Sequence, residues 1–413
     1  MSRNEENMTI YEIKFRDTRE LADSLKAIGA DMRSLPFFDN RREIRSLYLS
    51  CVDVRAANVI KQEMLSRGGD AAVHAHAIDC RVRESDVIIF GTVKQISFLA
   101  DKLELMSWWG FPEIVKALRG AVHSFSKKTT KVLLPSGQTI TLGERTLLMS
   151  IINLSDDSFH KESRTYGNIE ATTAKALEHA ENGADILDIG AESTRPGASR
   201  IPESEEIKLI IPAIKEIRKN LPVMPISVDT TRKNVAEAAL KAGADIINDI
   251  SGLSFEPEIA GTAARFGALL VIMHMRGTPR TMGTLCSYKN LLREINEFFD
   301  EKIEIASSFG VDPSMIIIDP GIGFAKNYSQ NLFLLRHIES LRIHSKPILV
   351  GASRKGSIGR ATDSEDTSER LEGTLAISSL CAWSGVDILR VHDTKENKKA
   401  VMMAEAIRDA DHA

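Results

Sequence analysis

Three stretches of the chain repeat one local pattern: HAENGADILDIG (residues 179–190), ALKAGADIINDISG (239–252) and CAWSGVDILRVHD (381–393). In each stretch a helix-like sequence runs into a glycine, and a small residue, an Asp and a short aliphatic run follow. Glycine is the common residue just past the end of a helix, and short aliphatic runs suit buried strands. The repeated pattern therefore predicts helices that each lead directly into a parallel strand.

Two looser variants, SSFGVDPSMIIIDPG (307–321) and RFGALLVIMH (265–274), extend the pattern along the chain. Eight strands are expected in total, at residues 147–152, 186–189, 226–228, 246–247, 269–273, 315–318, 348–350 and 388–391. Helical stretches separate them, for example at 168–181, 233–241, 291–308 and 369–382. A doubly wound open sheet is the competing fold, but no GxGxxG follows the first strand. The sequence predicts the α/β class, with a (β/α)₈ TIM barrel over residues 132–413.

The residues before the barrel predict a separate, smaller α/β domain, residues 1–127, to which the sequence assigns no role. Its expected helices are 18–28 and 54–67, its expected strands 46–51 and 87–91, and SKKTTK (126–131) is its expected boundary. KVLLPSGQTITL (131–142) reads as a hairpin that is a candidate cap for the bottom of the barrel. His74 and His76 are candidate metal ligands on one face of a strand, without an evident third ligand.

Composition narrows the possible partners. The chain has 413 residues and a net charge of −4, which gives no reason to expect nucleic acid or an anionic membrane as a partner. Its charged start and the lack of a long apolar run argue against export and membrane spanning. The four cysteines are widely spaced and form no CxxC pair, which favours free thiols in the cytoplasm.

Polar side chains follow or end all eight expected strands, where a barrel of this kind places its active site. They are Asn153, Asp188 with the following Glu192-Ser193-Thr194-Arg195, Asp229, Asn248-Asp249, His274, Asp319, Ser353-Arg354-Lys355, and Arg390 with His392. One such residue alone is more often a satisfied polar cap than a functional group. Eight groups converging on one mouth indicate a binding site.

The residues at the mouth sort into two chemical sets. Asp229, Asn248 and Asp319 can accept and donate hydrogen bonds at the edge of a heterocycle that carries ring N–H, amine and carbonyl groups. Four cationic residues lie on or directly after the last two expected strands, 348–350 and 388–391, whose following loops 7 and 8 are the usual phosphate site of this fold. They are Arg354, Lys355, Arg390 and His392. The sequence therefore predicts a heterocyclic substrate that carries an anionic group.

Eight segments together resemble the dihydropteroate synthase family, in its order and spacing. They are LLMSIINLSDDSF (147–159), GADILDIGAESTRPGAS (183–199), ISVDTTR (226–232), GADIINDISGL (243–253), VIMHMRGTPRTM (271–282), IIIDPGIGFAK (316–326), GASRKGSIG (351–359) and DILRVHD (387–393). The resemblance implies an enzyme of folate biosynthesis that condenses (7,8-dihydropterin-6-yl)methyl diphosphate with 4-aminobenzoate. It also implies that the enzyme is a homodimer.

The resemblance implies a role for each of the following residues. Asp229, Asn248, Asp319 and Lys355 would hold the pterin, and Thr194, Arg390 and His392 the diphosphate. Phe159, Arg195, Pro196 and Phe324 would form the 4-aminobenzoate pocket, and Asn153 would help to hold Mg²⁺ on the diphosphate. His274 and Met275 would line the pterin pocket rather than act as acid or base.

The departures from the family pattern lie on the arylamine side. Asp156 stands where Pro is usual, and Gly356 stands where a Ser often helps to bind the benzoate carboxylate; Ser357 is a candidate substitute. Three alternatives therefore stay open: the same chemistry with a different arylamine, a pterin-dependent methyltransferase, and a non-catalytic pterin-binding protein. The methyltransferase has no diphosphate to expel and no evident need for Arg195, Lys355, Arg390 and His392 together.

Overall fold

The structure is a computed structural model, and it describes residues 15, 18–125, 129–154, 168–192 and 200–410. The chain divides into two compact units, residues 1–126 with 410–413, and residues 127–409. Among the described residues, none of the helices combines the length and the apolar character that a bilayer crossing requires.

The first unit contains a three-stranded antiparallel sheet in the order β1-β3-β2. Its elements are α1 (Thr18–Ala27), α2 (Leu35–Asp39), β1 (Arg45–Asp53), α3 (Val54–Ser66), β2 (Asp70–Ala72), β3 (Glu84–Gly91), α4 (Val93–Leu103) and α5 (Phe111–Ser124). Side chains of β3 alternate between buried and exposed, and buried Val87 and Ile89 pack with Ile60 of α3 and Leu99 of α4. The expected helices and strands are present, but α2, β2, α4 and α5 were not predicted.

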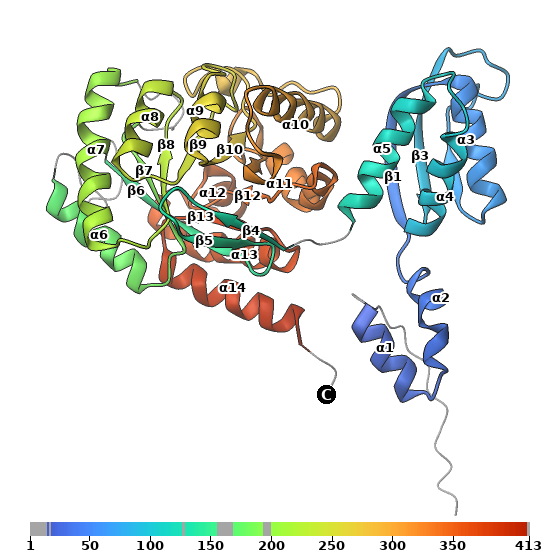
Figure 1. Cartoon of the computed structure of the whole chain (residues 1–413), viewed down its shortest axis with the longest axis horizontal. Helices are drawn as coiled ribbons and strands as arrows, with labels where there is room; N and C mark the ends of the chain where they lie inside the picture. The colour runs from blue at the N-terminus through green and yellow to red at the C-terminus, as the bar shows by residue number, and fades with distance from the viewer. Residues whose placement is uncertain (1–14, 16–17, 126–128, 155–167, 193–199, 411–413) are drawn as a thin grey trace, which may run out of the picture. The chain divides into compact units, whose positions relative to one another are not determined.

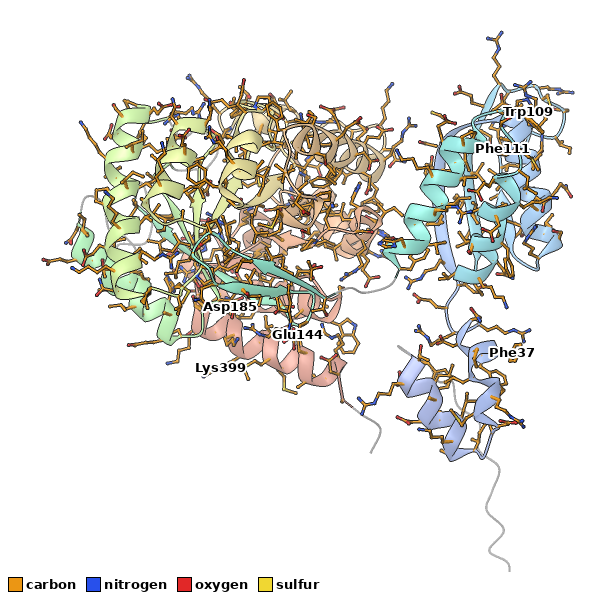
Figure 2. All side chains as sticks on the ribbon, viewed as in Figure 1. Phe37, Trp109, Phe111, Glu144, Asp185 and Lys399 are labelled. Carbon is orange, nitrogen blue, oxygen red and sulfur yellow. The ribbon has the colours of Figure 1, made fainter. Side chains whose placement is uncertain are left out.

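The first unit contains two histidines that lie close together and a pair of neighbouring aromatic rings. The prediction that His74 and His76 lie on a strand is wrong: β2 ends at Ala72, and His76 lies in a turn. The two imidazole centroids are 5.8 Å apart, and no group of three metal-ligating side chains is found within the described residues. Trp109 and Phe111, labelled in Figure 2, lie side by side with ring centroids 6.2 Å apart.

The second unit is a (β/α)₈ barrel, as the sequence predicts. Its strands are β6 (Leu147–Asn153), β7 (Ile186–Gly190), β8 (Ile226–Asp229), β9 (Ile246–Asp249), β10 (Leu269–Met273), β11 (Ile316–Asp319), β12 (Leu349–Val350) and β13 (Ile388–Val391). They form one parallel sheet in the order β11-β10-β9-β8-β7-β6-β13-β12. A parallel bridge between Ile318 and Ile348 joins the two outer strands and closes the barrel.

Helices surround the strands as an outer layer (Figure 1). They are α6 (Ile169–Glu181), α7 (Glu203–Asn220), α8 (Lys233–Ala242), α9 (Ile259–Phe266), α10 (Leu291–Ser308), α11 (Tyr328–Arg336), α12 (Gly356–Thr362), α13 (Leu371–Trp383) and α14 (Thr394–Arg408). The glycines of the repeated pattern end their helices in the left-handed region, with φ of 90° at Gly183, 113° at Gly243 and 73° at Gly385. A side chain is strained at such angles, which explains the glycine before each of these strands.

The hairpin of β4 (Thr130–Leu133) and β5 (Thr139–Leu142) caps the amino-terminal end of the barrel, as expected (Figure 1). Its buried Ile140 and Leu142 pack with the first inward-facing residues of the strands, among them Ile186 and Ile388. The Ser136 amide donates to Asp245 Oδ1 at 2.9 Å and fixes the turn at this end. Asp185, labelled in Figure 2, lies directly before β7 at the same end.

The barrel interior changes from apolar to polar along the strands. Side chains of a strand alternate between the two faces of the sheet, so every second residue faces inward. On β7 these are Ile186, Asp188 and Gly190, and on β13 they are Ile388 and Arg390. Ile186 and Ile388 belong to the apolar layer over the hairpin, whereas Asp188 and Arg390 lie one inward position further. The polar interior thus begins before the strand ends and continues to the carboxyl-terminal mouth.

Candidate active site

An arginine held by two carboxylates lies at the base of the mouth. Arg390 Nε donates to Asp188 Oδ2 at 2.6 Å, and Arg390 Nη2 donates to Asp229 Oδ2 at 2.8 Å. Asp188 is fully buried, and Asp229 is 8% exposed. Three strands, β7, β8 and β13, therefore bring one guanidinium and two carboxylates together, although the three residues are far apart in the sequence.

Asn248 of β9 extends this cluster. Its Nδ2 donates to Asp188 Oδ2 at 3.3 Å, so the same carboxylate oxygen receives both Asn248 and Arg390. Burial raises the pKa of the Asp229 carboxyl to about 7; the Arg390 guanidinium opposes this rise and the Asp188 charge adds to it. The Asp229 carboxyl is therefore harder to ionise than an aspartate in water.

Asp319 and Lys355 form the other side of the predicted pterin site. Lys355 Nζ donates to the Ile322 carbonyl and lies 4.5 Å from the Phe324 ring centroid. Burial lowers the pKa of the Lys355 ammonium to about 8, and the nearby Asp319 charge opposes this shift. Burial also raises the pKa of Asp319, whose Oδ1 accepts the Gly321 amide at 2.7 Å. Lys355, Asp319 and Phe324 thus lie together at the ends of β11 and β12.

The remaining predicted cations have protein partners. His392 Nδ1 lies 3.0 Å from Ser353 Oγ. Arg354, which adopts a left-handed φ of 57°, donates from Nε to Asp393 Oδ2 at 2.8 Å. Asp393 occupies the N-cap position of α14, but its side chain makes no capping hydrogen bond because it holds Arg354. Arg354 therefore shapes loop 7 through this ion pair, while His392 stays at the mouth.

A buried Lys–His pair supports the loop after β11. Lys326 Nζ donates to His274 Nδ1 at 2.9 Å and to the carbonyls of Gly321 and Phe324 at 3.1 and 3.0 Å. Burial lowers the pKa of Lys326 to about 7 and that of His274 well below its usual value. A neutral His274 that accepts from Lys326 is a structural anchor, and Met275 packs in the apolar cluster that contains Phe324.

Two features of the arylamine side bear on the predictions. Ser357 Oγ is buried and has no hydrogen-bond partner in the described part of the chain, and its role as a substitute for a serine at position 356 stays a prediction. Nothing lies within 4 Å of a Cβ built at Gly356, which leaves open space there. The predicted Phe159, Thr194, Arg195 and Pro196 lie outside the described residues.

The predicted Mg²⁺ ligand, Asn153, ends β6 and pairs in register with Gly190 of β7. Within the described residues no group of three His, Cys, Asp or Glu side chains could hold a metal ion. Mg²⁺ usually binds through one or two protein oxygens, waters and the phosphates of its substrate. A single amide oxygen at the mouth fits that mode of binding.

Sequence reasoning named Asp188 as part of its strand but gave it no role. The signal was present, because Asp188 is an ionisable residue in the buried run ILDIG and has the inward parity of Ile186 and Gly190. What the sequence did not show was the pairing with Arg390, which is 202 positions away.

Comparisons with known proteins agree with this geometry. A family profile described as pterin binding enzyme matches residues 149–392. The dihydropteroate synthase of Synechocystis sp. is 44% identical over 275 residues, which cover 66% of this chain and 94% of that protein. A probable bifunctional folylpolyglutamate synthase/dihydropteroate synthase of Halobacterium salinarum is 36% identical over 357 residues, or 86% of this chain and 42% of that protein.

A solved structure shows the same fold. The Xanthomonas albilineans dihydropteroate synthase with 4-aminobenzoic acid has a TM-score of 0.63 and 36% identity, covering 68% of this chain and 100% of that chain. The profile matches more than half of the chain and includes every barrel strand-end residue from Asn153 to His392. The chain therefore belongs to the dihydropteroate synthase family of pterin-binding enzymes.

Proposed function

We propose that this enzyme condenses (7,8-dihydropterin-6-yl)methyl diphosphate with 4-aminobenzoate to give 7,8-dihydropteroate and diphosphate. The observation that carries the proposal is the buried polar cluster at the carboxyl ends of the strands, in which Arg390 lies between Asp188 and Asp229. A buried set of acceptors beside fixed cations suits a substrate with a donor-rich heterocycle at one end and an anion at the other.

The pterin is held by Asp229, Asn248, Asp319 and Lys355. The two carboxylates and the Asn248 amide face the ring N–H and exocyclic amine groups, which are donors. Both carboxylates are nearly buried, so their hydrogen bonds to the ring form away from water and discriminate strongly against rings that lack the donors. Lys355, placed between Asp319 and the Phe324 ring, donates to an acceptor on the pterin.

The reaction is a substitution at the pterin CH₂ group. A bond forms between the amine nitrogen and this carbon, the C–O bond to diphosphate breaks, and its electron pair leaves with the diphosphate oxygen. The amine nitrogen then loses a proton to solvent. An arylamine is a modest nucleophile, so stabilising the charges that develop provides most of the catalysis.

The leaving diphosphate is held by Thr194, Arg390 and His392. A guanidinium has five N–H donors, and the contacts with Asp188 and Asp229 use two of those of Arg390. The others stay available to an anion. Asn153 would hold Mg²⁺ against the diphosphate, where the ion offsets negative charge on the leaving oxygens.

The arylamine pocket is assigned to Phe159, Arg195, Pro196 and Phe324. The Xanthomonas albilineans relative with 4-aminobenzoic acid supports the choice of amine. In this chain the space at Gly356 lies where the family often has a serine, so the backbone N–H remains as the donor there. A bulkier arylamine is the alternative nucleophile that this space favours.

We also infer that the enzyme is a homodimer in the cytoplasm. α13 and α14 pack on each other and expose Leu380, Trp383, Met403 and Ile407, each at least 47% exposed. A cluster of large exposed apolar side chains on two neighbouring helices is typical of a protein interface. All four cysteines are free, and Cys51 and Cys80 are exposed, which suits a reducing compartment.

The test is diphosphate release by the purified enzyme with the pterin diphosphate and Mg²⁺, with and without 4-aminobenzoate. We expect release only when the amine is present, and stoichiometric formation of dihydropteroate. Release with another arylamine but not with 4-aminobenzoate would change the substrate. No release with any arylamine would contradict the proposed reaction.

A further inference from the structure

We propose that Asp188 is a positioning residue for the pterin site: its buried carboxylate fixes the Arg390 guanidinium and the Asn248 amide in the orientations that receive the substrate. The proposal rests on the proposed function, because that function places both partners on the substrate. Asp188 itself lies one inward position below the strand end and is fully buried.

The hydrogen bonds of Asp188 converge on one oxygen. Oδ2 accepts Arg390 Nε at 2.6 Å and Asn248 Nδ2 at 3.3 Å, whereas Oδ1 has no partner among the described residues. A buried carboxylate needs its charge balanced, and Arg390 is the cation that contacts it. The side-chain hydrogen bonds of Asp188 within the described residues therefore go to Arg390 and Asn248.

The contact with Asp188 sets which end of the Asn248 amide faces the substrate. Because Asp188 can only accept, it selects the Asn248 rotamer that turns Nδ2 toward it. The carbonyl Oδ1 of Asn248, which makes no hydrogen bond within the described residues, is then the end left for a donor on the pterin. Without Asp188 the two amide orientations become closer in energy, and a flipped amide would present a donor to a donor.

The contact with Asp188 also sets the direction of Arg390. Arg390 bridges Asp188 of β7 and Asp229 of β8, so its planar guanidinium is fixed at two points. A fork held in this way keeps its remaining N–H groups in one direction, which preorganises them for the leaving group. Asp188 thus acts on both halves of the substrate through residues that touch it.

Removing the charge of Asp188 changes the titration of Asp229. The charged groups that act on Asp229 include Arg390 on β13, Asp188 on β7, Glu206 on α7, Asp249 on β9, and Lys355 directly before α12. In an Asp188→Asn variant one negative neighbour is lost and Arg390 pairs with Asp229 alone, so the pKa of Asp229 falls. If the ionised Asp229 binds the pterin, the acid limb of kcat/KM lies at lower pH in this variant than in the native enzyme.

The experiment compares the native enzyme with Asp188→Asn and with Asp245→Asn as a matched control. Asp245 is also a fully buried carboxylate, paired with Arg218 at 2.6 Å, but it lies at the hairpin end of the barrel. We expect Asp188→Asn to raise the KM for the pterin diphosphate on the order of tenfold to a hundredfold, as misplaced reacting groups do. Its acid limb moves to lower pH and its KM for 4-aminobenzoate is unchanged. Asp245→Asn lowers thermal stability and leaves the pterin KM and the acid limb unchanged.

A pterin KM and an acid limb that match the native enzyme in Asp188→Asn would overturn the proposal. Calorimetry across pH measures the binding of 6-hydroxymethylpterin, and this binding tests the role of Asp188 separately from the proposed reaction. If the native enzyme binds this pterin but releases no diphosphate with any arylamine, the reaction is wrong, and weaker binding by Asp188→Asn alone still supports the role of Asp188. Equal binding of this pterin by the native enzyme and by Asp188→Asn, or no binding by the native enzyme, overturns the proposed role of Asp188. If Asp188→Asn does not fold, Asp188→Ser carries the same expectations.

Discussion

At the scale of single residues, the parity of buried strands identifies the site, but the pairing within it comes from the fold. Three site residues could be named from the sequence because each is a polar residue at the end of a buried apolar strand, where packing alone would favour an apolar side chain. They are Asp229, Asn248 and Asp319. Arg390 was predicted as a diphosphate ligand, and its bonds to Asp188 and Asp229 were not predicted. Contacts between strands depend on barrel closure and register, which sequence periodicity does not determine.

Gly356 offers a prediction at this scale. Gly356→Ser places a hydroxyl where nothing lies within 4 Å of the new Cβ, so the substitution fits without strain. A hydrogen bond to a charged carboxylate contributes about 1.5–3 kcal/mol, so the KM for 4-aminobenzoate should fall by about tenfold or more. Steady-state kinetics with each substrate varied in turn measures this, and the KM for the pterin diphosphate should not change.

Ser357→Ala is the control for Gly356→Ser, because Ser357 Oγ is buried and we expect it not to contact the carboxylate of 4-aminobenzoate. Its KM for 4-aminobenzoate should equal that of the native enzyme. A higher KM for 4-aminobenzoate in Gly356→Ser would contradict the prediction, and would indicate that the space at Gly356 accommodates a larger arylamine.

At the scale of elements, the barrel was predictable because five of its eight buried strands follow one repeated pattern, closely in three and loosely in two, whereas the first unit carries no repeat. The expected 269–273 and 388–391 strands have the bounds of β10 and β13. α4 was missed although Thr92 and Gln95 form a capping box, a signal that the sequence contains. The strand expected at His74 and His76 was wrong because β2 ends after three residues, and so short a strand gives no alternation to read.

The hairpin of β4 and β5 gives a prediction about stability without catalysis. Leu142 is 1% exposed and packs under the barrel, so Leu142→Ala should lower the free energy of unfolding by about 2–5 kcal/mol. Leu133 of β4 is 66% exposed, and Leu133→Ala should change the free energy of unfolding by less than about 0.5 kcal/mol. Urea denaturation measures both effects. Because the hairpin lies at the end of the barrel opposite the site, both variants should keep the native KM values; a raised pterin KM in Leu142→Ala would show that the cap also shapes the mouth.

At the scale of the whole molecule, the chain consists of two units with separate cores. The core of the first unit contains described residues between Leu47 and Phe125, and the two main cores of the barrel contain described residues from Val132 onward. The Halobacterium salinarum relative matches 357 residues, more than the barrel unit contains, so its similarity extends into the first unit. The Synechocystis relative matches 275 residues, which are 94% of its length. A match of that size corresponds to the barrel unit alone.

The separate cores lead to a prediction about truncation. A chain of residues 127–413 keeps the barrel, its hairpin cap and every site residue assigned above, so it should fold and release diphosphate with the kcat and both KM values of the full chain. Circular dichroism and thermal unfolding establish that the truncated chain is folded before its kinetics are measured. A folded barrel with a lower kcat or an altered KM would contradict this expectation and would assign the first unit a part in catalysis. Adding back residues 1–126 as a separate chain then distinguishes the two origins of such a loss, because only a unit that acts by binding the barrel can restore the rate in trans.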